Sequence, residues 1–117
     1  MKLDKAIEIA SGEATKSNMR YTLGAIIFNK CNYVTGYNRA FGCCVSQKEK
    51  RYSLHAEEMA IRKGNRLEMD FSHATLVVVR VNKMGDLRFS KPCETCQKLI
   101  IDAGIKNIYY IDEYKGE

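Results

Sequence analysis

Apolar and polar residues are spaced along the chain in patterns that predict both helices and strands. The first segment has apolar residues three and four positions apart, namely Leu3, Ala6, Ile7 and Ala10. This spacing predicts an amphipathic helix from Leu3 to about Thr15. Two short apolar segments follow, Tyr21–Phe28 and Tyr33–Tyr37, and the polar residues 29–32 between them predict a β-hairpin.

The second half of the chain predicts two more helices and two more strands. Residues 38–53 are rich in glycine, polar and basic residues without a clear period, which predicts a long functional loop. After this loop, the sequence predicts a helix over His55–Lys63 that ends at Gly64 and Asn65, and then a central strand over Ala74–Val81. A turn is predicted over Asn82–Asp86. The last predicted elements are a helix over Cys93–Ala103, with Pro92 before it and Gly104 after it, and a buried strand over Asn107–Ile111. This order predicts an α/β domain with a mixed sheet and helices on its faces.

Length and composition favour one globular domain over residues 1–117. The content of 45% hydrophobic and 28% charged residues is too apolar for a disordered chain. The longest apolar runs, 76–79 and 99–101, are much shorter than the about 20 residues of a membrane-spanning helix. Asp4 and Glu8 make the first residues unlike a signal peptide. These features predict a cytoplasmic protein with no membrane partner.

The net charge of +5 is concentrated in the middle of the chain. Residues 16–66 contain ten lysines and arginines against three acidic residues, whereas residues 1–15 and 67–117 each carry −1. A basic segment of this kind favours a phosphorylated partner, either a nucleic acid or a free nucleotide. A solvated basic surface without such a partner is the alternative.

Two short motifs indicate a metal centre: His-Ala-Glu at residues 55–57 and Pro-Cys-Glu-Thr-Cys at residues 92–96, each at the start of a predicted helix. Cys93 and Cys96 are three residues apart, so on a helix they share a face and can bind one ion. With His55 they form a set of one imidazole and two thiolates, which suits tetrahedral Zn²⁺ with a fourth position for water. The alternatives are a redox or structural Cys-x-x-Cys pair, and a core position for Cys96.

Glu57 follows His55 by two residues and therefore lies in the first turn of the same predicted helix. There its side chain can converge on an ion beyond the helix end and reach a bound water instead of the metal. This arrangement predicts that Glu57 is a general base beside a zinc-activated water, as in a hydrolase. The next carboxylate, Glu58, is expected to point to solvent.

These motifs resemble the signature of the zinc-dependent cytidine deaminase-like superfamily, His-x-Glu followed by Pro-Cys-x-x-Cys. The resemblance covers about residues 23–111. It implies a three-layer α/β/α sandwich with a mixed sheet of four to five strands. It also implies one Zn²⁺ per chain, held by His55, Cys93 and Cys96. By the same resemblance, Glu57 transfers protons.

The resemblance further implies where a substrate binds. Residues 23–26 are similar to the first-strand segment that lines the family's base pocket. Residues 36–39, Gly-Tyr-Asn-Arg, are similar to a segment of deoxycytidylate deaminases and tRNA adenosine deaminases in which the Asn binds the substrate sugar. The residues expected to contact substrate are Asn38, Gly24, Ala25, Ala56, Arg39 and Ser90. The loop residues expected to contact a phosphate are Lys48, Lys50 and Arg51.

Together these features predict a zinc-dependent hydrolytic deaminase that converts a cytosine base to uracil in a free nucleotide or nucleoside such as dCMP. One alternative is a nucleic-acid deaminase that acts on tRNA adenosine or single-stranded cytosine. Another is a catalytically inactive, zinc-stabilised module with the same fold. A homo-oligomer is expected, and the sheet is expected either to have four strands or to be completed by another subunit.

Several residues outside the motifs carry weaker expectations. Without a secretory signal, five cysteines do not suggest a disulfide framework. Three cysteines lie outside the metal motifs, Cys31, Cys43 and Cys44. They are expected to be free, buried or half-buried thiols, and a second zinc site is the alternative. His73 is expected at the surface and not as a ligand. Tyr109 and Tyr110 are expected in core and subunit contacts.

Overall fold

The structure is a computed structural model that describes residues 1–18, 22–40 and 53–111. Within these residues the helices are α1 (Leu3–Ala14), α2 (Ala56–Arg66) and α3 (Glu94–Ala103). The strands are β1 (Thr22–Phe28), β2 (Tyr33–Tyr37), β3 (Arg39–Ala40), β4 (Ser53–Leu54), β5 (Thr75–Val81), β6 (Leu87–Arg88) and β7 (Asn107–Tyr109).

The main sheet has the order β2–β1–β5, and both β6 and β7 pair with the other side of β5. β1 is antiparallel to β2 and to β5, and β6 is antiparallel to β5, whereas β7 is parallel to β5. The sheet is therefore mixed, as predicted. β3 and β4 form a separate two-stranded ribbon in which Arg39 pairs with Leu54. This ribbon leads directly into α2.

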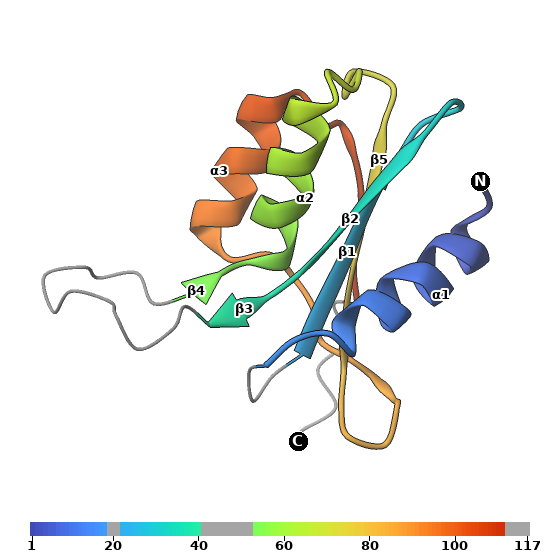
Figure 1. The fold of residues 1–117 in the computed structure, drawn as a ribbon, viewed down its shortest axis with the longest axis vertical. Helices are drawn as coiled ribbons and strands as arrows, with labels where there is room; N and C mark the ends of the chain where they lie inside the picture. Colours follow the sequence, from blue (N-terminus) through green and yellow to red (C-terminus); the bar gives the residue numbers. More distant parts are fainter. Residues whose placement is uncertain (19–21, 41–52, 112–117) are drawn as a thin grey trace, which may run out of the picture.

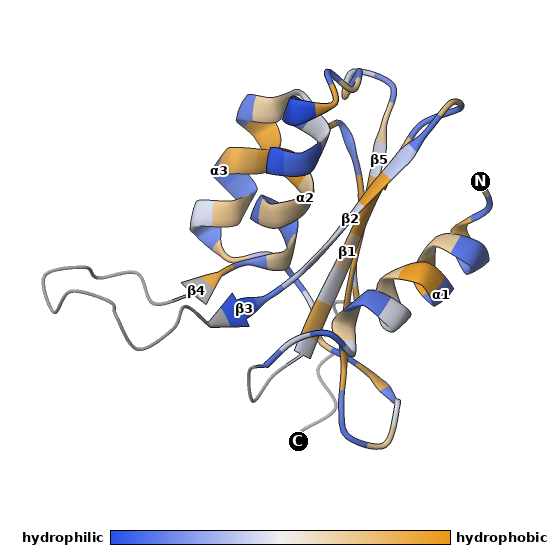
Figure 2. Ribbon diagram, viewed as in Figure 1, coloured by the Kyte–Doolittle hydropathy of each residue, from blue (hydrophilic) through white to orange (hydrophobic). Residues whose placement is uncertain are grey.

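The helices cover both faces of the main sheet, with α1 on one face and α2 beside α3 on the other (Figure 1). β1 and β5 carry apolar residues along most of their length (Figure 2), as strands between two helical layers require. Successive side chains of β1 point to opposite faces of the sheet. Ile26 packs against α1, whereas Ala25 and Ile27 pack in the cluster under α2 and α3. The predicted three-layer α/β/α sandwich is confirmed.

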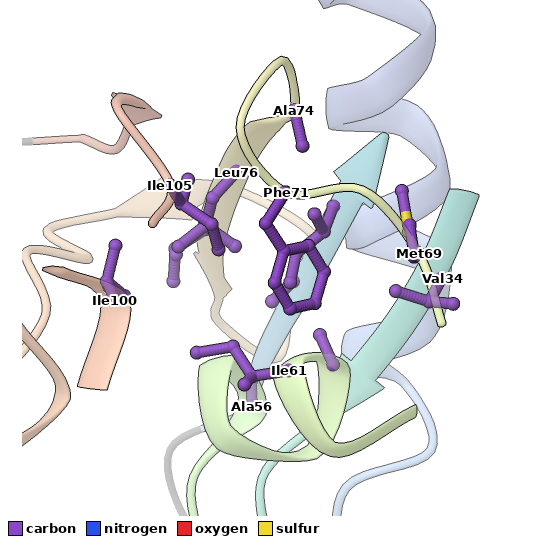
Figure 3. Close-up of a cluster of buried hydrophobic side chains, with 13 residues drawn as sticks. Val34, Ala56, Ile61, Met69, Phe71, Ala74, Leu76, Ile100 and Ile105 are labelled. Carbon is purple, nitrogen blue, oxygen red and sulfur yellow. The ribbon is translucent and has the colours of Figure 1, made fainter. Parts of the chain in front are cut away.

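The larger core cluster lies between the sheet and the layer of α2 and α3. Figure 3 shows the ring of Phe71 within this cluster, between Leu76 of β5, Val34 of β2 and Ile61 of α2. All four side chains are buried. Burial of each such side chain contributes about 1.5–3 kcal/mol. This packing fixes α2 against the sheet, and with it the residues at the start of α2.

Helix α3 ends at Ala103, before Gly104, as the sequence predicts. Gly104 follows the helix in the left-handed conformation, with φ of 87°. The Ile105 N–H donates to the Ile100 carbonyl and the Gly104 N–H donates to the Ile101 carbonyl, so the last carbonyls of the helix are satisfied.

The predicted end of α2 at Gly64 and Asn65 is wrong, because the helix continues past both. Gly64 lies inside the helix at a close contact, where a Cβ would lie 2.6 Å from a ring atom of Phe71. The left-handed residue that ends α2 is Glu68, with φ of 55°. The Met69 N–H donates to the Gly64 carbonyl, as the Ile105 N–H donates to the Ile100 carbonyl at the end of α3. Both helices therefore end in a Schellman motif.

The last strand also differs from the prediction of a buried strand over Asn107–Ile111. β7 ends at Tyr109, whose side chain is 50% exposed. The physical reason is its position, since β7 pairs with β5 alone among the described strands and leaves its other edge open. Tyr110 packs against the larger core cluster, as expected.

Within residues 1–18, 22–40 and 53–111, none of the helices has the length and apolar character needed to cross a bilayer.

Candidate metal centre

Three potential metal ligands from two helix ends meet at one place. The Nδ1 atom of His55 lies 3.2 Å from Sγ of Cys96 and 3.7 Å from Sγ of Cys93. One ligand atom from each residue lies within 4.8 Å of the other two. The structure thus brings together the three residues that the sequence predicts as zinc ligands.

His55 and Cys93 occupy equivalent positions, each immediately before a helix. Their backbones are extended, with φ and ψ of −77° and 152° at His55 and of −68° and 166° at Cys93. Neither side chain makes a capping hydrogen bond to its own helix, so both are available as ligands. Cys96 lies in the first turn of α3 and is 2% exposed.

Hydrogen bonds hold the loop that precedes the cysteine motif. Ser90 is 2% exposed, and its Oγ donates to the Val78 carbonyl at 2.9 Å and accepts from the Ile111 N–H at 2.8 Å. The Nε2 atom of Gln97 donates to the Pro92 carbonyl at 2.9 Å. The start of α3 is therefore fastened to β5 and to the end of the last described segment.

The distances between these ligand atoms fit a zinc ion. Nitrogen and sulfur atoms at about 2.0–2.3 Å from a tetrahedral zinc lie about 3.5–3.8 Å from one another. The separations from His55 Nδ1 to the two sulfur atoms, 3.2 Å and 3.7 Å, are close to this range. One nitrogen and two sulfur donors also match the ligand types that zinc prefers.

Glu57 lies beside the cluster and is 3% exposed. Burial raises the pKa of its carboxyl group, although its own backbone N–H, the nearby His55 and the Cys96 thiol act in the opposite direction. The pKa of the Cys96 thiol is also raised, first by burial and then by the Glu57 carboxylate. A bound divalent cation relieves such unfavourable charge, because it deprotonates a coordinating thiol. The donor set of one nitrogen and two sulfur atoms therefore fits a single zinc ion.

The expectation that Glu58 points to solvent is wrong. The residue is 5% exposed, and its Oε2 accepts a hydrogen bond from Nη2 of Arg62 at 2.9 Å. The two residues are four positions apart, which places their side chains together on the helix surface. Glu58 is therefore part of the packing of α2 and is unsuitable as a neutral comparison for Glu57.

The ribbon of β3 and β4 brings the predicted sugar contact to the metal ligands. Arg39 pairs with Leu54, and continuing this antiparallel register by one residue sets Asn38 opposite His55. Asn38 is 7% exposed, and its Oδ1 accepts from the Leu23 N–H at 2.8 Å. Arg39 is exposed. The ribbon thus brings the backbone of these two residues toward that of His55, and their contact with a substrate stays a prediction.

The other four residues expected to contact substrate lie inside the fold. Ala25 and Ala56 are 0% exposed and belong to the larger core cluster. A Cβ at Gly24 would overlap the Ala10 carbonyl of α1, so Gly24 faces the opposite layer. The Ser90 hydroxyl already bonds two backbone groups. Substrate contacts at these four positions stay a prediction.

Some predictions fall on residues that the structure does not describe, and these residues are Lys48, Lys50, Arg51, Cys43 and Cys44. Cys31, expected to be buried or half-buried, is instead exposed. It lies in the turn after β1, where the Asn29 Oδ1 accepts from its N–H at 2.8 Å. His73 is at the surface, as expected, with Nδ1 2.8 Å from the Ser72 Oγ.

A hollow of about 490 Å³ lies beside α2. It is lined by Leu54, Met59, Arg62, Asn65 and Arg66. Sequence analysis did not select its two arginines, because the helical pattern of α2 marks only the apolar positions that face the sheet. The sequence feature that could have identified them is the spacing of four residues between Arg62 and Arg66, which places both side chains on one side of the helix.

The family model for the cytidine and deoxycytidylate deaminase zinc-binding region matches residues 1–112 of this chain. Among curated proteins, the chain is similar to ComE operon protein 2 of Bacillus subtilis (strain 168), with 29% identity over 106 residues. This match covers 82% of the chain and 51% of that protein. The chain thus spans about half the length of this relative.

Solved deaminase structures share the fold. The dCMP deaminase of the cyanophage S-TIM5 in apo form is similar with a TM-score of 0.72 and 24% identity, covering 99% of this chain and 89% of that chain. A structure of the same enzyme in complex with dCMP and dUMP has a TM-score of 0.71 and 24% identity, covering 99% and 87%. Cytidine deaminase from Burkholderia pseudomallei has a TM-score of 0.75 and 17% identity, covering 100% and 89%.

Proposed function

The chain belongs to the cytidine and deoxycytidylate deaminase family, and from this premise we propose that it converts a cytosine base to uracil in a free nucleotide or nucleoside, dCMP above all. The observation that carries the proposal is the cluster of His55, Cys93 and Cys96 with the buried Glu57 beside it. The complex of the cyanophage enzyme with dCMP and dUMP supports a nucleotide as substrate.

His55, Cys93 and Cys96 would hold one zinc ion through one nitrogen and two sulfur atoms. Three protein ligands leave a fourth position open, as in catalytic zinc sites and unlike closed structural ones. When bound, zinc lowers the pKa of water to about 7 and so supplies a nucleophile at neutral pH. A bound zinc ion would hold both cysteines as thiolates and so offset the burial that raises the pKa of the Cys96 thiol.

Glu57 would move the protons of the reaction. Its carboxylate would take a proton from the attacking water and deliver it to N3 of the cytosine ring. It would then take the remaining proton from the new hydroxyl group at C4 and deliver it to the amine, which leaves as ammonia. One C–O bond forms and one C–N bond breaks, so uracil and ammonia account for all atoms. The burial of Glu57 beside Cys96 keeps this carboxyl group away from bulk water and close to the metal ligands.

We propose Asn38 and Arg39 as the contacts for the sugar and the phosphate. The hydrogen bond from Leu23 to the Asn38 Oδ1 orients the amide next to the metal centre, and the exposed Arg39 guanidinium follows it. Lys48, Lys50 and Arg51 would add positive charge from residues 41–52. A charge-assisted contact contributes about 1.5–3 kcal/mol, which is about tenfold or more in kcat/KM.

A single domain over residues 1–117, a homo-oligomeric state and a cytoplasmic location also belong to the proposal. Support for an oligomer comes from two large apolar side chains at the surface of α3 and β7, Ile101 at 70% exposure and Tyr109 at 50%. Light scattering on the purified protein would give its mass directly, and a monomeric mass at micromolar concentration would remove this part of the proposal.

A deamination screen tests the substrate. It compares cytosine, cytidine, deoxycytidine, CMP, dCMP, dCTP and adenosine with a single-stranded oligonucleotide and a tRNA, each at two salt concentrations. We expect dCMP to be converted faster than deoxycytidine, with a shallow dependence on salt because one phosphate meets few charges. The substitution Arg39→Ala should remove the preference for dCMP.

The basic segment 16–66 gives the nucleic-acid alternative its support. Steeply salt-dependent turnover of the oligonucleotide or tRNA, with negligible turnover of every free nucleotide, would establish that alternative. Equal rates on deoxycytidine and dCMP would leave a nucleoside deaminase. No turnover of any compound by zinc-loaded protein would favour an inactive zinc-stabilised module.

A further inference from the structure

Gly36 on β2 lets the sheet and α2 approach closely. A Cβ at this position would overlap the Ala56 carbonyl oxygen and lie 2.7 Å from the Ala60 amide nitrogen. Real Cβ atoms essentially never come within 3.0 Å of such atoms. Because the obstructing atoms belong to the helix backbone, no rotamer change relieves the overlap. Any side chain at Gly36 therefore requires the first turn of α2 to move away from β2.

That first turn carries one half of the metal centre. Ala56 lies between His55 and Glu57, so a displacement of its carbonyl group moves both neighbours. A second contact fastens the same turn to β2, since the Tyr37 N–H points to the Met59 Sδ at 3.5 Å.

The other half of the metal centre is fastened to a different strand. Ser90 joins the loop before the cysteine motif to the Val78 carbonyl of β5. The hydrogen bonds from Ser90 and Gln97 involve no residue of β2. The separation between the histidine and the two cysteines thus depends on how closely α2 approaches β2.

We propose that Gly36 is a positioning residue of the metal centre, because its lack of a side chain sets the place of His55 relative to the two cysteine ligands. The inference rests on the zinc site and not on the identity of the substrate. It therefore requires readouts of metal binding, which are independent of deamination.

Gly24 on β1 provides a matched control on the opposite face of the sheet. A Cβ there would overlap the Ala10 carbonyl oxygen and lie 2.8 Å from the Ala14 amide nitrogen of α1. The substitution Gly24→Ala thus forces a helix backbone away from the sheet as Gly36→Ala does. It acts on α1, which carries no metal ligand.

The experiment compares the wild-type chain with Gly36→Ala and Gly24→Ala. Three quantities are measured for each protein: the melting temperature, the zinc dissociation constant by competition with a chromophoric chelator, and the visible spectrum with Co²⁺ in place of zinc, which reports ligand geometry. We expect Gly36→Ala to weaken zinc binding by about 10–100-fold, as loss of support for a metal ligand does, and to change the Co²⁺ spectrum. Gly24→Ala should lower the melting temperature by a similar amount and leave the metal readouts within about twofold.

The inference is overturned if Gly36→Ala binds zinc with wild-type affinity and spectrum, or if Gly24→Ala weakens binding equally. If Gly36→Ala does not fold, Met59→Leu takes its place. This substitution nearly conserves volume but removes the sulfur that faces the Tyr37 N–H, so it loosens α2 from β2 without a clash. It should weaken zinc binding severalfold in the folded protein, and unchanged affinity in this variant would also overturn the inference.

Discussion

The Sγ atom of Cys96 lies 3.2 Å from Nδ1 of His55, although the two residues are 41 positions apart in the chain. Neither helix end alone could bind the ion tightly, since each offers an incomplete ligand set. The complete set exists only when α2 and α3 lie side by side on the sheet (Figure 1). Metal binding and folding are therefore coupled.

The first prediction concerns the ligands themselves. Cys93→Ala and Cys96→Ala should each remove the bound zinc and lower the melting temperature by about 11–22 °C. A ligand at 100 times its Kd stabilises by about 2.7 kcal/mol, and each kcal/mol shifts the melting temperature by about 4–8 °C. Metal analysis and calorimetry measure both effects. Cys31→Ala, at an exposed cysteine, should change neither. Full zinc occupancy after loss of both motif cysteines would contradict the assignment.

The metal centre and the layering were predictable from the sequence because each depends on local spacing. Cys93 and Cys96 are one helical turn apart, and apolar residues three and four positions apart mark the buried face of α1. The almost entirely apolar sequence of β5 predicted a strand between two layers. Such patterns need no knowledge of distant residues.

Features that depend on distant contacts were not predictable. The glycine at position 64 suggested a helix end, yet it is a contact point for Phe71 within α2. The two-residue strands β3, β4 and β6 are too short to show any period. Glu58 is buried although its position in the helical pattern indicated solvent. The hydrogen bond from the Ser90 hydroxyl to the Val78 carbonyl also joins residues 12 positions apart, and no local pattern shows it.

The second prediction follows from the matching ends of α2 and α3. Both helices end on a left-handed residue, which is Glu68 after α2 and Gly104 after α3. This conformation costs a residue with a Cβ about 1–2 kcal/mol. Glu68→Gly should therefore stabilise the protein by about 1 kcal/mol, and Gly104→Ala should destabilise it by a similar amount. Urea unfolding measures both changes, and a loss of stability in Glu68→Gly would refute this reason for the end of α2.

The third prediction concerns pH. Burial alone would raise the pKa of Glu13, but hydrogen bonds from Lys16 at 2.8 Å and from Thr35 at 2.9 Å outweigh burial and lower it. A carboxyl group whose pKa is lower in the folded state stabilises the fold above its unfolded pKa, and this contribution is lost as the pH falls through the folded pKa.

The free energy of unfolding should thus fall less in Glu13→Gln than in the wild type between about pH 6 and about pH 3. Both proteins share every other carboxylate and the metal ligands, so the difference isolates Glu13. Glu8→Gln, at an exposed position of α1, is the control and should follow the wild type. Parallel pH profiles for Glu13→Gln and the wild type would show that these hydrogen bonds do not stabilise the fold.

The central claim is that Glu57 transfers protons at a zinc centre that deaminates cytosine. The most direct measurement is the formation of dUMP from dCMP by the zinc-loaded wild type and by Glu57→Gln, with the zinc content of each protein determined in parallel. Glu57→Gln should keep one zinc per chain and lose at least about 10²–10⁴-fold in kcat, as removal of a general acid–base does. Glu8→Gln should retain wild-type turnover. Wild-type rates of dUMP formation in Glu57→Gln at full zinc occupancy would contradict the account.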